Sequence, residues 1–564
     1  MAFSRACGFT RRNYFVSIAA SVLLLAAVIA VARANNQRRL RLRAGQVVDL
    51  TQGPKYRTDR VLVRFRAGTT QTSIAAAHEA VQAEVAREFH SVPRLQVVRL
   101  GAGISVQAAL RTYRQNPSVL YAEPDYIVKV ATTPNDPQFT SQWNLHNTGQ
   151  NGGTPGADIH APEAWEITTG SSNVVVGVID TGADYTHPDL AANIWTSTSS
   201  VSITTSSGST LQCPPGVHGI NVIAQTCDPM DDNAHGTHVS GIIGGLGNNG
   251  IGVAGINWNV QILPCKFLGA DGTGDIGGAI TCFDFMKQLK DSGVNIVATN
   301  NSWGGALSSQ ALQDAIAAQE QDGILTIAAA GNSFSDNDVL PFYPANISLP
   351  NIISVAASDR NDSLVSFSNS GRYTVHLAAP GDEILSTTPN DTYSVFSGTS
   401  MAAPHVTGVA ALLKAQDPTR DWRAIKNLIL AGGDALAVTG DTITSKRLNA
   451  FGAISCTNSQ ATSRLLPVPD TISGAVGAPI VLSALNINCA NPAGNVSVQI
   501  SPGGQVITLT DDGTGVDQAA GDGIYTAEWS PAATGDYTLS FPDGSSVNVA
   551  VLNPYGYQEV PSSY

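Results

Sequence analysis

The fold class follows from one stretch, Val174-Val175-Val176-Gly177-Val178-Ile179-Asp180-Thr181-Gly182. It is a short apolar run that ends in an acidic residue and a glycine turn. Since a strand that is apolar on both sides must be covered on both faces, the run is typical of a parallel sheet. Comparable runs, separated by helical patterns, follow at 261–267, 295–299 and 324–329. Residues 132–455 are therefore predicted to form an α/β domain, a parallel sheet with helices on both faces.

Smaller domains are expected on either side. Residues 60–131 have the pattern of a small α+β unit, and the sequence predicts two strands and two helices there, at 61–65, 95–100, 72–89 and 105–116. After Cys456, strand-like runs recur about every ten residues between Gly, Asp and Pro turns, which favours an antiparallel β-sandwich. The acidic turns of this domain, 511–515 and 521–523, could suit calcium but are better explained as hairpin turns.

The N-terminus has the pattern of an export signal. An apolar run of 18 residues, Phe15 to Ala32, follows three basic residues, Arg5, Arg11 and Arg12. The run ends in Ala32-Arg33-Ala34, a small-x-small cleavage site, so we interpret residues 1–34 as a signal peptide. The alternative is an uncleaved membrane anchor, because 18 residues can just span a bilayer.

The net charge of −13 is unevenly distributed. Residues 1–131 hold 19 of the 31 Lys and Arg but only 7 of the 44 Asp and Glu, which leaves 12 basic and 37 acidic residues in 132–564. A body this acidic repels nucleic acid and anionic membranes, and it suits a secreted or cation-binding protein. We therefore expect no nucleic-acid partner.

The cysteine count also fits export. Of the seven cysteines, Cys7 leaves with the signal, and an even number remains for an oxidising compartment. Proximity in sequence favours three disulfides, Cys213–Cys227, Cys265–Cys282 and Cys456–Cys489. Two buried thiols are an alternative for Cys265 and Cys282.

Three short motifs supply an acid, an imidazole and a hydroxyl. Asp180 ends the strand quoted above, His235-Gly236-Thr237-His238 opens a small-residue helix, and Ser400 follows Gly398-Thr399 at the start of another. Each alone has a plain structural explanation: a turn aspartate, a core or metal-binding histidine, an N-cap serine. Together they suit nucleophilic catalysis, because a hydroxyl needs a base to take its proton and a carboxylate can fix the tautomer of an imidazole base.

In these motifs the chain resembles the subtilase family of serine endopeptidases. Asp180–Gly182, His235–His238 and Gly398-Thr399-Ser400-Met401-Ala402-Ala403-Pro404-His405 match the family's D-T-G, H-G-T-H and G-T-S-M-A-x-P-H motifs. The resemblance covers about residues 133–453, and 60–131 resembles the family's inhibitory propeptide. With the signal peptide, it implies four segments: signal peptide 1–34, propeptide 35–131, subtilisin-like catalytic domain 132–455 and C-terminal β-sandwich 456–564.

The resemblance implies a secreted endopeptidase that is made as a self-processing zymogen. Its partners would be protein and peptide substrates and its own propeptide, which acts as intramolecular chaperone and inhibitor. We expect a monomer with no stable membrane anchor after signal cleavage. The rival, from another class, is an inactive protease fold that serves as a secreted binding or adhesive module through its β-domain.

The resemblance also implies roles for individual residues. Ser400 is the expected nucleophile, His235 the base, Asp180 its partner and Asn332 a donor to the oxyanion. Substrate-binding positions are expected at Gly272, Gly274, Ser302, Gly304, Ala330 and Phe342. Phe342 departs from the family pattern, which usually has Gly before the corresponding Tyr-Pro. Its ring would either fill the floor of the primary specificity pocket or point into the core.

Calcium (Ca²⁺) is the structural cofactor that the resemblance implies. The main site is expected to use Asp136, Asp189 and a loop after the histidine helix, with ligands at Leu246, Asn249, Ile251 and Val253. This loop is one residue longer than the common form, so Asn248 is an alternative to Asn249. Asp228 and Asp231 are candidates for a second site, because oxygen ligands at short spacing suit Ca²⁺. The alternative for them is a solvated acidic loop.

Overall fold

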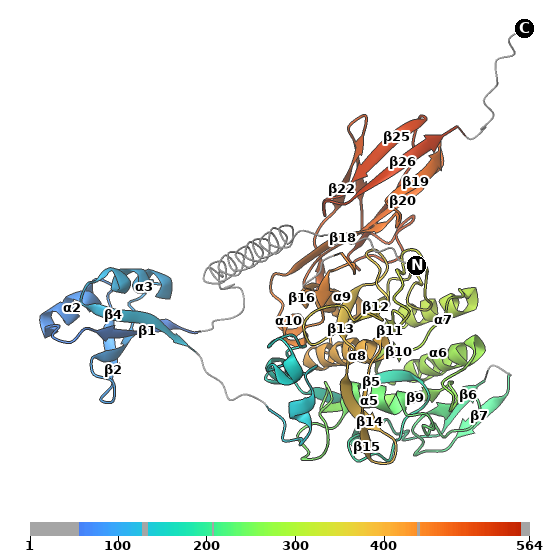
Figure 1. Cartoon of the computed structure of the whole chain (residues 1–564), viewed down its shortest axis with the longest axis horizontal. Helices are drawn as coiled ribbons and strands as arrows, with labels where there is room; N and C mark the ends of the chain where they lie inside the picture. Colours follow the sequence, from blue (N-terminus) through green and yellow to red (C-terminus); the bar gives the residue numbers. More distant parts are fainter. Residues whose placement is uncertain (1–55, 127–132, 206–207, 437–439, 554–564) are drawn as a thin grey trace, which may run out of the picture. The chain divides into compact units, whose positions relative to one another are not determined.

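The computed structural model describes residues 56–126, 133–205, 208–436 and 440–553 (Figure 1). The predicted signal peptide and both ends of the predicted propeptide, 35–55 and 127–131, lie outside these residues. The chain divides into two compact units, Met1–Ile127 and Val128–Tyr564. Among the described helices, none has the length and apolar character that crossing a membrane requires.

The first unit is a four-stranded antiparallel sheet with two helices against one face. The strand order is β2-β3-β1-β4, with β1 Tyr56–Phe65, β2 Glu84–Glu88, β3 Leu95–Arg99 and β4 Val119–Tyr126. The helices α2 (Gln71–Glu79) and α3 (Val106–Gln115) share one apolar core with the sheet. The helix predicted over 72–89 is wrong in its second half. The chain turns at Gln82, whose φ is +50°, and residues 84–88 then pair with β3.

A nine-stranded sheet forms the centre of the second unit (Figure 1). Its order is β16-β17-β13-β12-β11-β10-β5-β9-β8, and all neighbours are parallel except β16 and β17. The strands are β5 Gly170–Asp180, β8 Ile220–Asn221, β9 Asn259–Lys266, β10 Ile296–Asn301, β11 Leu325–Ala329, β12 Ile352–Ser358, β13 Leu377–Pro380, β16 Asp434–Ala435 and β17 Lys446–Arg447. The predicted parallel sheet is therefore confirmed.

Helices cover both faces of this sheet. On β5, Val176 and Val178 face a core shared with α5 (His235–Gly244), α8 (Thr399–Gln416) and α9 (Trp422–Gly432). The alternate residues Val175 and Ile179 face the core of α6 (Ile276–Asp291) and α7 (Gln310–Gln321). The other elements are α4 Ala161–Trp165, α10 Ala450–Ile454, the hairpins β6 Val201–Thr204 with β7 Thr210–Cys213 and β14 Ile384–Thr388 with β15 Thr392–Phe396, and the 3₁₀ turns η1 Phe139–Ser141, η2 Gln150–Gly152 and η3 Ala191–Asn193.

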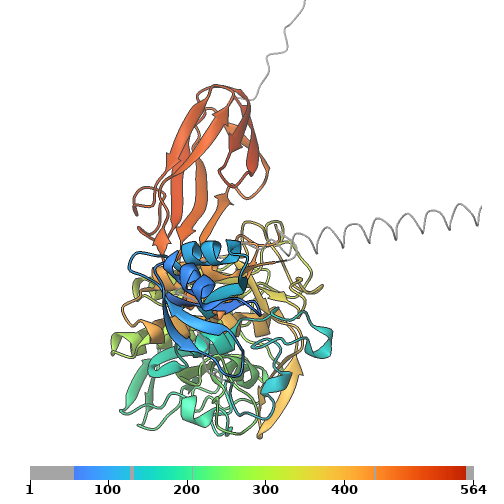
Figure 2. The same cartoon turned by 90° about the vertical axis from the view of Figure 1, so that its left-hand side faces the viewer.

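The C-terminal segment is a two-sheet β domain, as predicted, and its strands run side by side in both views (Figures 1 and 2). One sheet holds β18 Gln460–Leu466, β20 Ile480–Asn488, β21 Asn491–Pro492 and β24 Ile524–Trp529. The other holds β19 Thr471–Ala475, β22 Val496–Ser501, β23 Gln505–Leu509, β25 Gly535–Ser540 and β26 Ser546–Leu552. One pair, β19 and β26, is parallel, in contrast to the antiparallel prediction.

All three predicted disulfides are present: Cys213–Cys227, Cys265–Cys282 and Cys456–Cys489. The second one links β9 to α6, so Cys265 and Cys282 are not free buried thiols. The third one joins Cys456, just after α10, to Cys489, the residue that follows β20.

Candidate active site

The parallel strands bring the three sequence motifs to one edge of the sheet. Asp180 is the last residue of β5, and the segments after β10 and β11 carry Ser302 and Asn332. His235 begins α5. A cleft of about 830 Å³ lies at this edge, and His235, Ser302, Asn332 and Ser400 all line it. The carboxyl ends of strands are where α/β sheets place their ligand sites.

Asp180 and His235 form a close pair. His235 Nδ1 lies 2.8 Å from Oδ1 and 3.0 Å from Oδ2 of Asp180, whose side chain is fully buried. Asp180 Oδ1 also accepts a hydrogen bond from the Thr181 backbone N–H at 2.7 Å. Burial lowers the pKa of His235, but the charges of Asp180 and Asp231 and the bond to Asp180 outweigh it, so the pKa lies above its ordinary value.

Ser400 is the second residue of α8 and lines the same cleft as His235. Its hydroxyl donates to the backbone oxygen of Ser302 at 3.0 Å, and the Ser302 hydroxyl donates to the backbone oxygen of Ser400 at 2.8 Å. The hydroxyl must therefore rotate before it can donate to His235. Hydrogen bonds that serve catalysis are often loose without substrate and tighten when it binds.

The side-chain oxygen of Asn332 is fixed by hydrogen bonds, whereas its NH₂ group makes none to the part of the chain that the structure describes. Its Oδ1 accepts from the backbone N–H and the hydroxyl of Thr399, at 2.8 and 2.9 Å. Two donors on Oδ1 identify that atom as the oxygen, so the NH₂ group is turned away from Thr399. Because Asn332 lines the cleft beside Ser400, this NH₂ group is available to an oxygen in the cleft.

Most of the expected substrate-binding residues line the cleft, namely Gly272, Gly274, Ser302, Gly304 and Phe342. Ala330 is the exception. It is fully buried, its N–H donates to Val355, and its side chain packs with Ala356 and Ala378 behind the sheet edge. The expectation that Ala330 contacts substrate is therefore wrong, whereas its neighbours Ala329 and Gly331 do reach the cleft.

The half-buried ring of Phe342 lies between two segments of the cleft wall. A Cβ atom on Gly304 would overlap this ring, and one on Gly331 would lie 3.1 Å from its Cγ. Because neither glycine has a side chain, the ring can occupy the space between them. Of the two alternatives for Phe342, the structure favours the one in which its ring occupies space at the cleft.

The residues expected to bind calcium in the main site come together. Asp189 Oδ1 accepts from the Asn249 side chain at 2.7 Å, and Asp189 Oδ2 accepts from the Val253 N–H at 2.9 Å. The Leu246 N–H donates to the backbone oxygen of Asp189, and the Ile251 N–H donates to Asn249 Oδ1. Of the two asparagines left open by the sequence, Asn249 is therefore the one whose side chain reaches Asp189.

Asp136 lies against the same loop. Its Oδ2 accepts from the Asn248 N–H at 2.6 Å, while its Oδ1 is buried and has no hydrogen-bond partner among the described residues. Burial, together with the charge of Asp189, raises the pKa of Asp136 above its ordinary value. Two buried carboxylates and an orphaned oxygen are what a bound cation would stabilise, so these residues fit a Ca²⁺ site.

Asp228 and Asp231 do not form a second site. Asp228 is exposed and accepts from the Tyr185 hydroxyl and the Met230 N–H. Asp231 is buried, and its two oxygens accept five hydrogen bonds from neighbouring hydroxyls and backbone N–H groups. Because these donors occupy the lone pairs of Asp231, the expectation of a metal ligand there is wrong.

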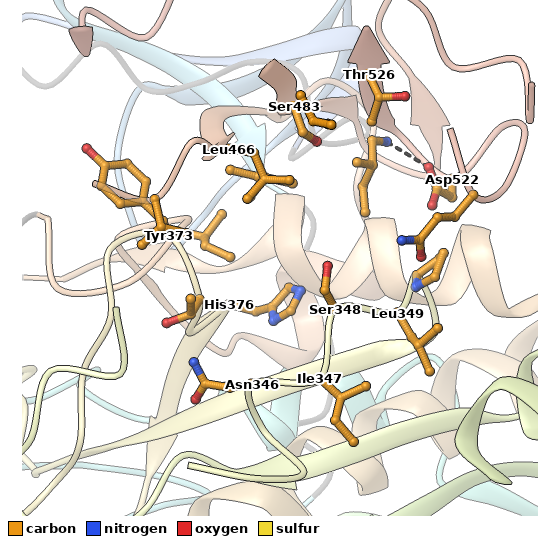
Figure 3. Close-up of a pocket in the computed structure, with 18 of the residues that line it drawn as sticks. Asn346, Ile347, Ser348, Leu349, Tyr373, His376, Leu466, Ser483, Asp522 and Thr526 are labelled. Atoms are coloured by element: carbon orange, nitrogen blue, oxygen red, sulfur yellow. Dashed lines mark hydrogen bonds between the residues drawn. The ribbon is translucent and has the colours of Figure 1, made fainter. Parts of the chain in front are cut away.

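A second cavity, of about 500 Å³, lies where the C-terminal domain meets the α/β domain (Figure 3). Leu466, Ser483 and Asp522 line it from the C-terminal domain, and Ser348 and His376 face them from the α/β domain. It shares no lining residue with the catalytic cleft among the described residues.

The acidic turns of the C-terminal domain lie beside this cavity. They belong to one long connection from β23 to β24, whose two ends pair antiparallel at Thr510 and Thr526, so the prediction of a separate short hairpin turn at each acidic segment is wrong. Oxygen atoms of Asp511, Asp517 and Asp522 lie within 4.8 Å of one another. Asp511 and Asp517 also accept bonds from backbone N–H groups of the same connection, which is a structural role for these carboxylates.

Comparisons with known proteins identify the family models and relatives that the chain matches. Residues 171–448 match the subtilase family, and residues 43–125 match the fervidolysin N-terminal prodomain. The chain is 34% identical to the thermophilic serine proteinase of Bacillus sp. strain AK1, over 71% of this chain and 88% of that protein. It is 35% identical to thermitase of Thermoactinomyces vulgaris, over 57% of this chain and 99% of that protein. It is 33% identical to the extracellular protease of Xanthomonas campestris, over 62% of each.

Proposed function

The chain belongs to the subtilase family and is a subtilisin-like serine endopeptidase with an N-terminal prodomain, and on this premise we propose that Ser400, His235 and Asp180 form its catalytic triad. The observation that carries the proposal is the pair of short contacts between His235 and the buried Asp180, at the same cleft as Ser400. The rival of an inactive binding module leaves this arrangement unexplained.

In the proposed reaction, Ser400 Oγ attacks the peptide carbonyl while His235 Nε2 takes the hydroxyl proton. His235 then donates this proton to the leaving amine, and an acyl-enzyme remains. Water, deprotonated by His235, attacks the ester carbonyl and releases the acid product and Ser400. Asp180 holds Nδ1, which fixes the tautomer that leaves Nε2 free to act as the base, and its charge stabilises the imidazolium.

The Asn332 amide is the proposed donor to the oxyanion. Its oxygen is held by Thr399, so its NH₂ group is oriented before substrate arrives. The backbone N–H of Ser400, near the start of α8, is the second proposed donor. Removal of one such donor lowers turnover by roughly 10²–10³-fold.

We further propose that calcium stabilises the fold at the loop of residues 246–253. Asp136, Asp189 and Asn249 would supply side-chain oxygens, and backbone carbonyls of the loop would complete the shell. The ion would offset the repulsion between the two buried carboxylates and tie the N-terminal segment of the α/β domain to α5. It takes no part in the chemical step.

The enzyme is also proposed to be secreted and to remove its own propeptide. The support is the export pattern at residues 1–34, the match of 43–125 to a prodomain, three disulfides and an extracellular relative. Residues 35–131 hold 15 Lys and Arg against 7 Asp and Glu, and the rest of the chain is strongly acidic. Complementary charge of this kind speeds docking.

Labelling with a serine-directed phosphonyl reagent tests the triad. We expect one label per wild-type molecule, on Ser400 by peptide mass, and none on Ser400→Ala. Ser473→Ala, which removes an exposed serine of β19, should be labelled like the wild type. Wild-type protein that is folded but not labelled would support the inactive module instead.

A further inference from the structure

Asp231 lies just before the helix that begins with His235, and it makes five hydrogen bonds there. Its Oδ1 accepts from the Thr181 hydroxyl at 2.9 Å and from the N–H groups of Asn233 and Ala234 at 2.9 and 3.1 Å. Its Oδ2 accepts from the N–H and hydroxyl of Thr237, at 3.0 and 2.6 Å. Since Asp231 is only 6% exposed, these neutral donors replace water around a buried charge.

These bonds reach both members of the Asp180–His235 pair through their chain neighbours. Thr181 follows Asp180, and its hydroxyl donates to Asp231 while it accepts from the Gly236 N–H at 2.9 Å. Gly236 follows His235. Asp231 and Thr181 thus connect the end of β5 to the first turn of α5.

The backbone between Asp231 and His235 needs such support. Ala234 has a φ of +98°, a conformation that residues with a side chain rarely adopt. The Ala234 N–H donates to Asp231, and so does the N–H of Asn233. Such conformations persist only where surrounding contacts determine them, and they cluster at functional sites.

The same segment is fixed against the turn after Asp180. A Cβ atom on Gly182 would overlap the backbone oxygen of Pro229 and would lie 3.2 Å from the backbone nitrogen of Asp231. The backbones of these two segments are therefore in direct contact. A shift of Asp231 would displace both the Asp180 turn and the start of α5.

Asp231 also acts on His235 through its charge. The charged groups that face His235 are Asp180 and Asp231, and both raise its pKa. Lys266, a buried cation, donates to Asp232 and to the backbone oxygens of Thr181 and Leu268, and no ion pair joins it to Asp231 among the described residues. The charge of Asp231 is therefore not neutralised by an ion pair among the described residues.

We propose that Asp231 is a positioning residue for the triad, which sets the orientation of His235 toward Asp180 and stabilises the imidazolium that forms during the reaction. This rests on the proposed triad. It assigns to a buried carboxylate outside the triad a role in turnover and not only in folding.

The test compares Asp231→Asn, Thr181→Val and the control Asp291→Asn, which removes the same charge from an exposed site on α6. Folding is checked by circular dichroism, and active molecules are counted by phosphonyl labelling. Then kcat, KM and the pH dependence of kcat/KM are measured. For Asp231→Asn we expect kcat to fall by about 10–100-fold, by analogy with the loss of a residue that supports a metal ligand. We expect KM to change by less than about threefold. The acid limb of the pH profile of kcat/KM, where activity rises as His235 loses its proton, should move to lower pH.

Thr181→Val separates geometry from charge, because it breaks the link to Gly236 but leaves the Asp231 carboxylate. We expect a lower kcat with the acid limb in its original place. Folded Asp231→Asn with wild-type kcat and an unmoved acid limb would overturn the proposal. If Asp231→Asn does not fold, wild-type kcat in folded Thr181→Val would overturn the geometric role. A wild type that is not labelled at Ser400 would instead refute the proposed function.

Discussion

Replacement of Phe342 with glycine should change which residue the enzyme accepts before the cut. The ring of Phe342 occupies the space between Gly304 and Gly331, so the wild type should prefer Ala or Leu there over Phe or Tyr. A buried aromatic side chain covers roughly 150–250 Å². At about 25 cal/mol per Å², full burial is worth about 4–6 kcal/mol.

A substrate ring in an open cleft is buried only in part, so about half of this energy, 2–3 kcal/mol, is expected. The Phe-to-Ala ratio of kcat/KM should therefore rise about 30–150-fold in Phe342→Gly. The assay uses peptides that differ only in the residue before the cut. Phe334→Gly is the matched control, because that ring is 79% exposed on the same loop. If Phe342→Gly folds and its ratio stays within about threefold of the control, Phe342 does not limit the pocket.

Three other predictions follow from buried charges. EDTA should lower the melting temperature of the wild type but have little effect on Asp136→Asn, because Ca²⁺ that binds only the folded state stabilises it by mass action; an unchanged wild-type melting temperature would refute the calcium assignment. The acid limb of kcat/KM should have its midpoint above pH 6.5, because the pKa of His235 is raised and its neutral form is the base; a limb below pH 6 would contradict this. His160→Gln should destabilise the protein at pH 6, because bonds to Asp434 and Glu163 raise the pKa of His160 to about 10 in the fold. Since the folded pKa is the higher one, this stability is complete below pH 6.5 and is lost as the pH approaches 10. Urea unfolding at pH 6 and pH 10 should therefore show that the variant is less stable than the wild type only at pH 6.

The sequence predicted the elements whose signals are local. The apolar run that ends at Asp180 identified β5, and the cysteine spacings identified three disulfides. The helix predicted over 72–89 failed in its second half because residues 84–88 pair with β3 instead of continuing the helix. Helical spacing alone does not reveal such a distant partner.

The candidate site residues also divide into those with a local sequence signal and those whose role depends on distant contacts. The motifs located Asp180, His235 and Ser400, but the sequence could not decide where the ring of Phe342 lies, because the answer depends on Gly304 and Gly331. Asp231 was expected near a metal because acidic residues crowd around it. One of its five hydrogen bonds comes from Thr181, which is fifty residues earlier in the chain, so only the fold reveals the link between Asp231 and the end of β5.

The N-terminus of the secreted protein is the most direct measure of the central claim that Ser400 drives a self-processing protease. Wild type and Ser400→Ala are made in a host without other extracellular proteases, and the intact mass and N-terminal sequence of each are determined. The account predicts a wild type that has lost the residues up to about 131, and a Ser400→Ala protein of the same fold that still carries residues 35–131. Ser400→Ala protein of mature size would contradict it.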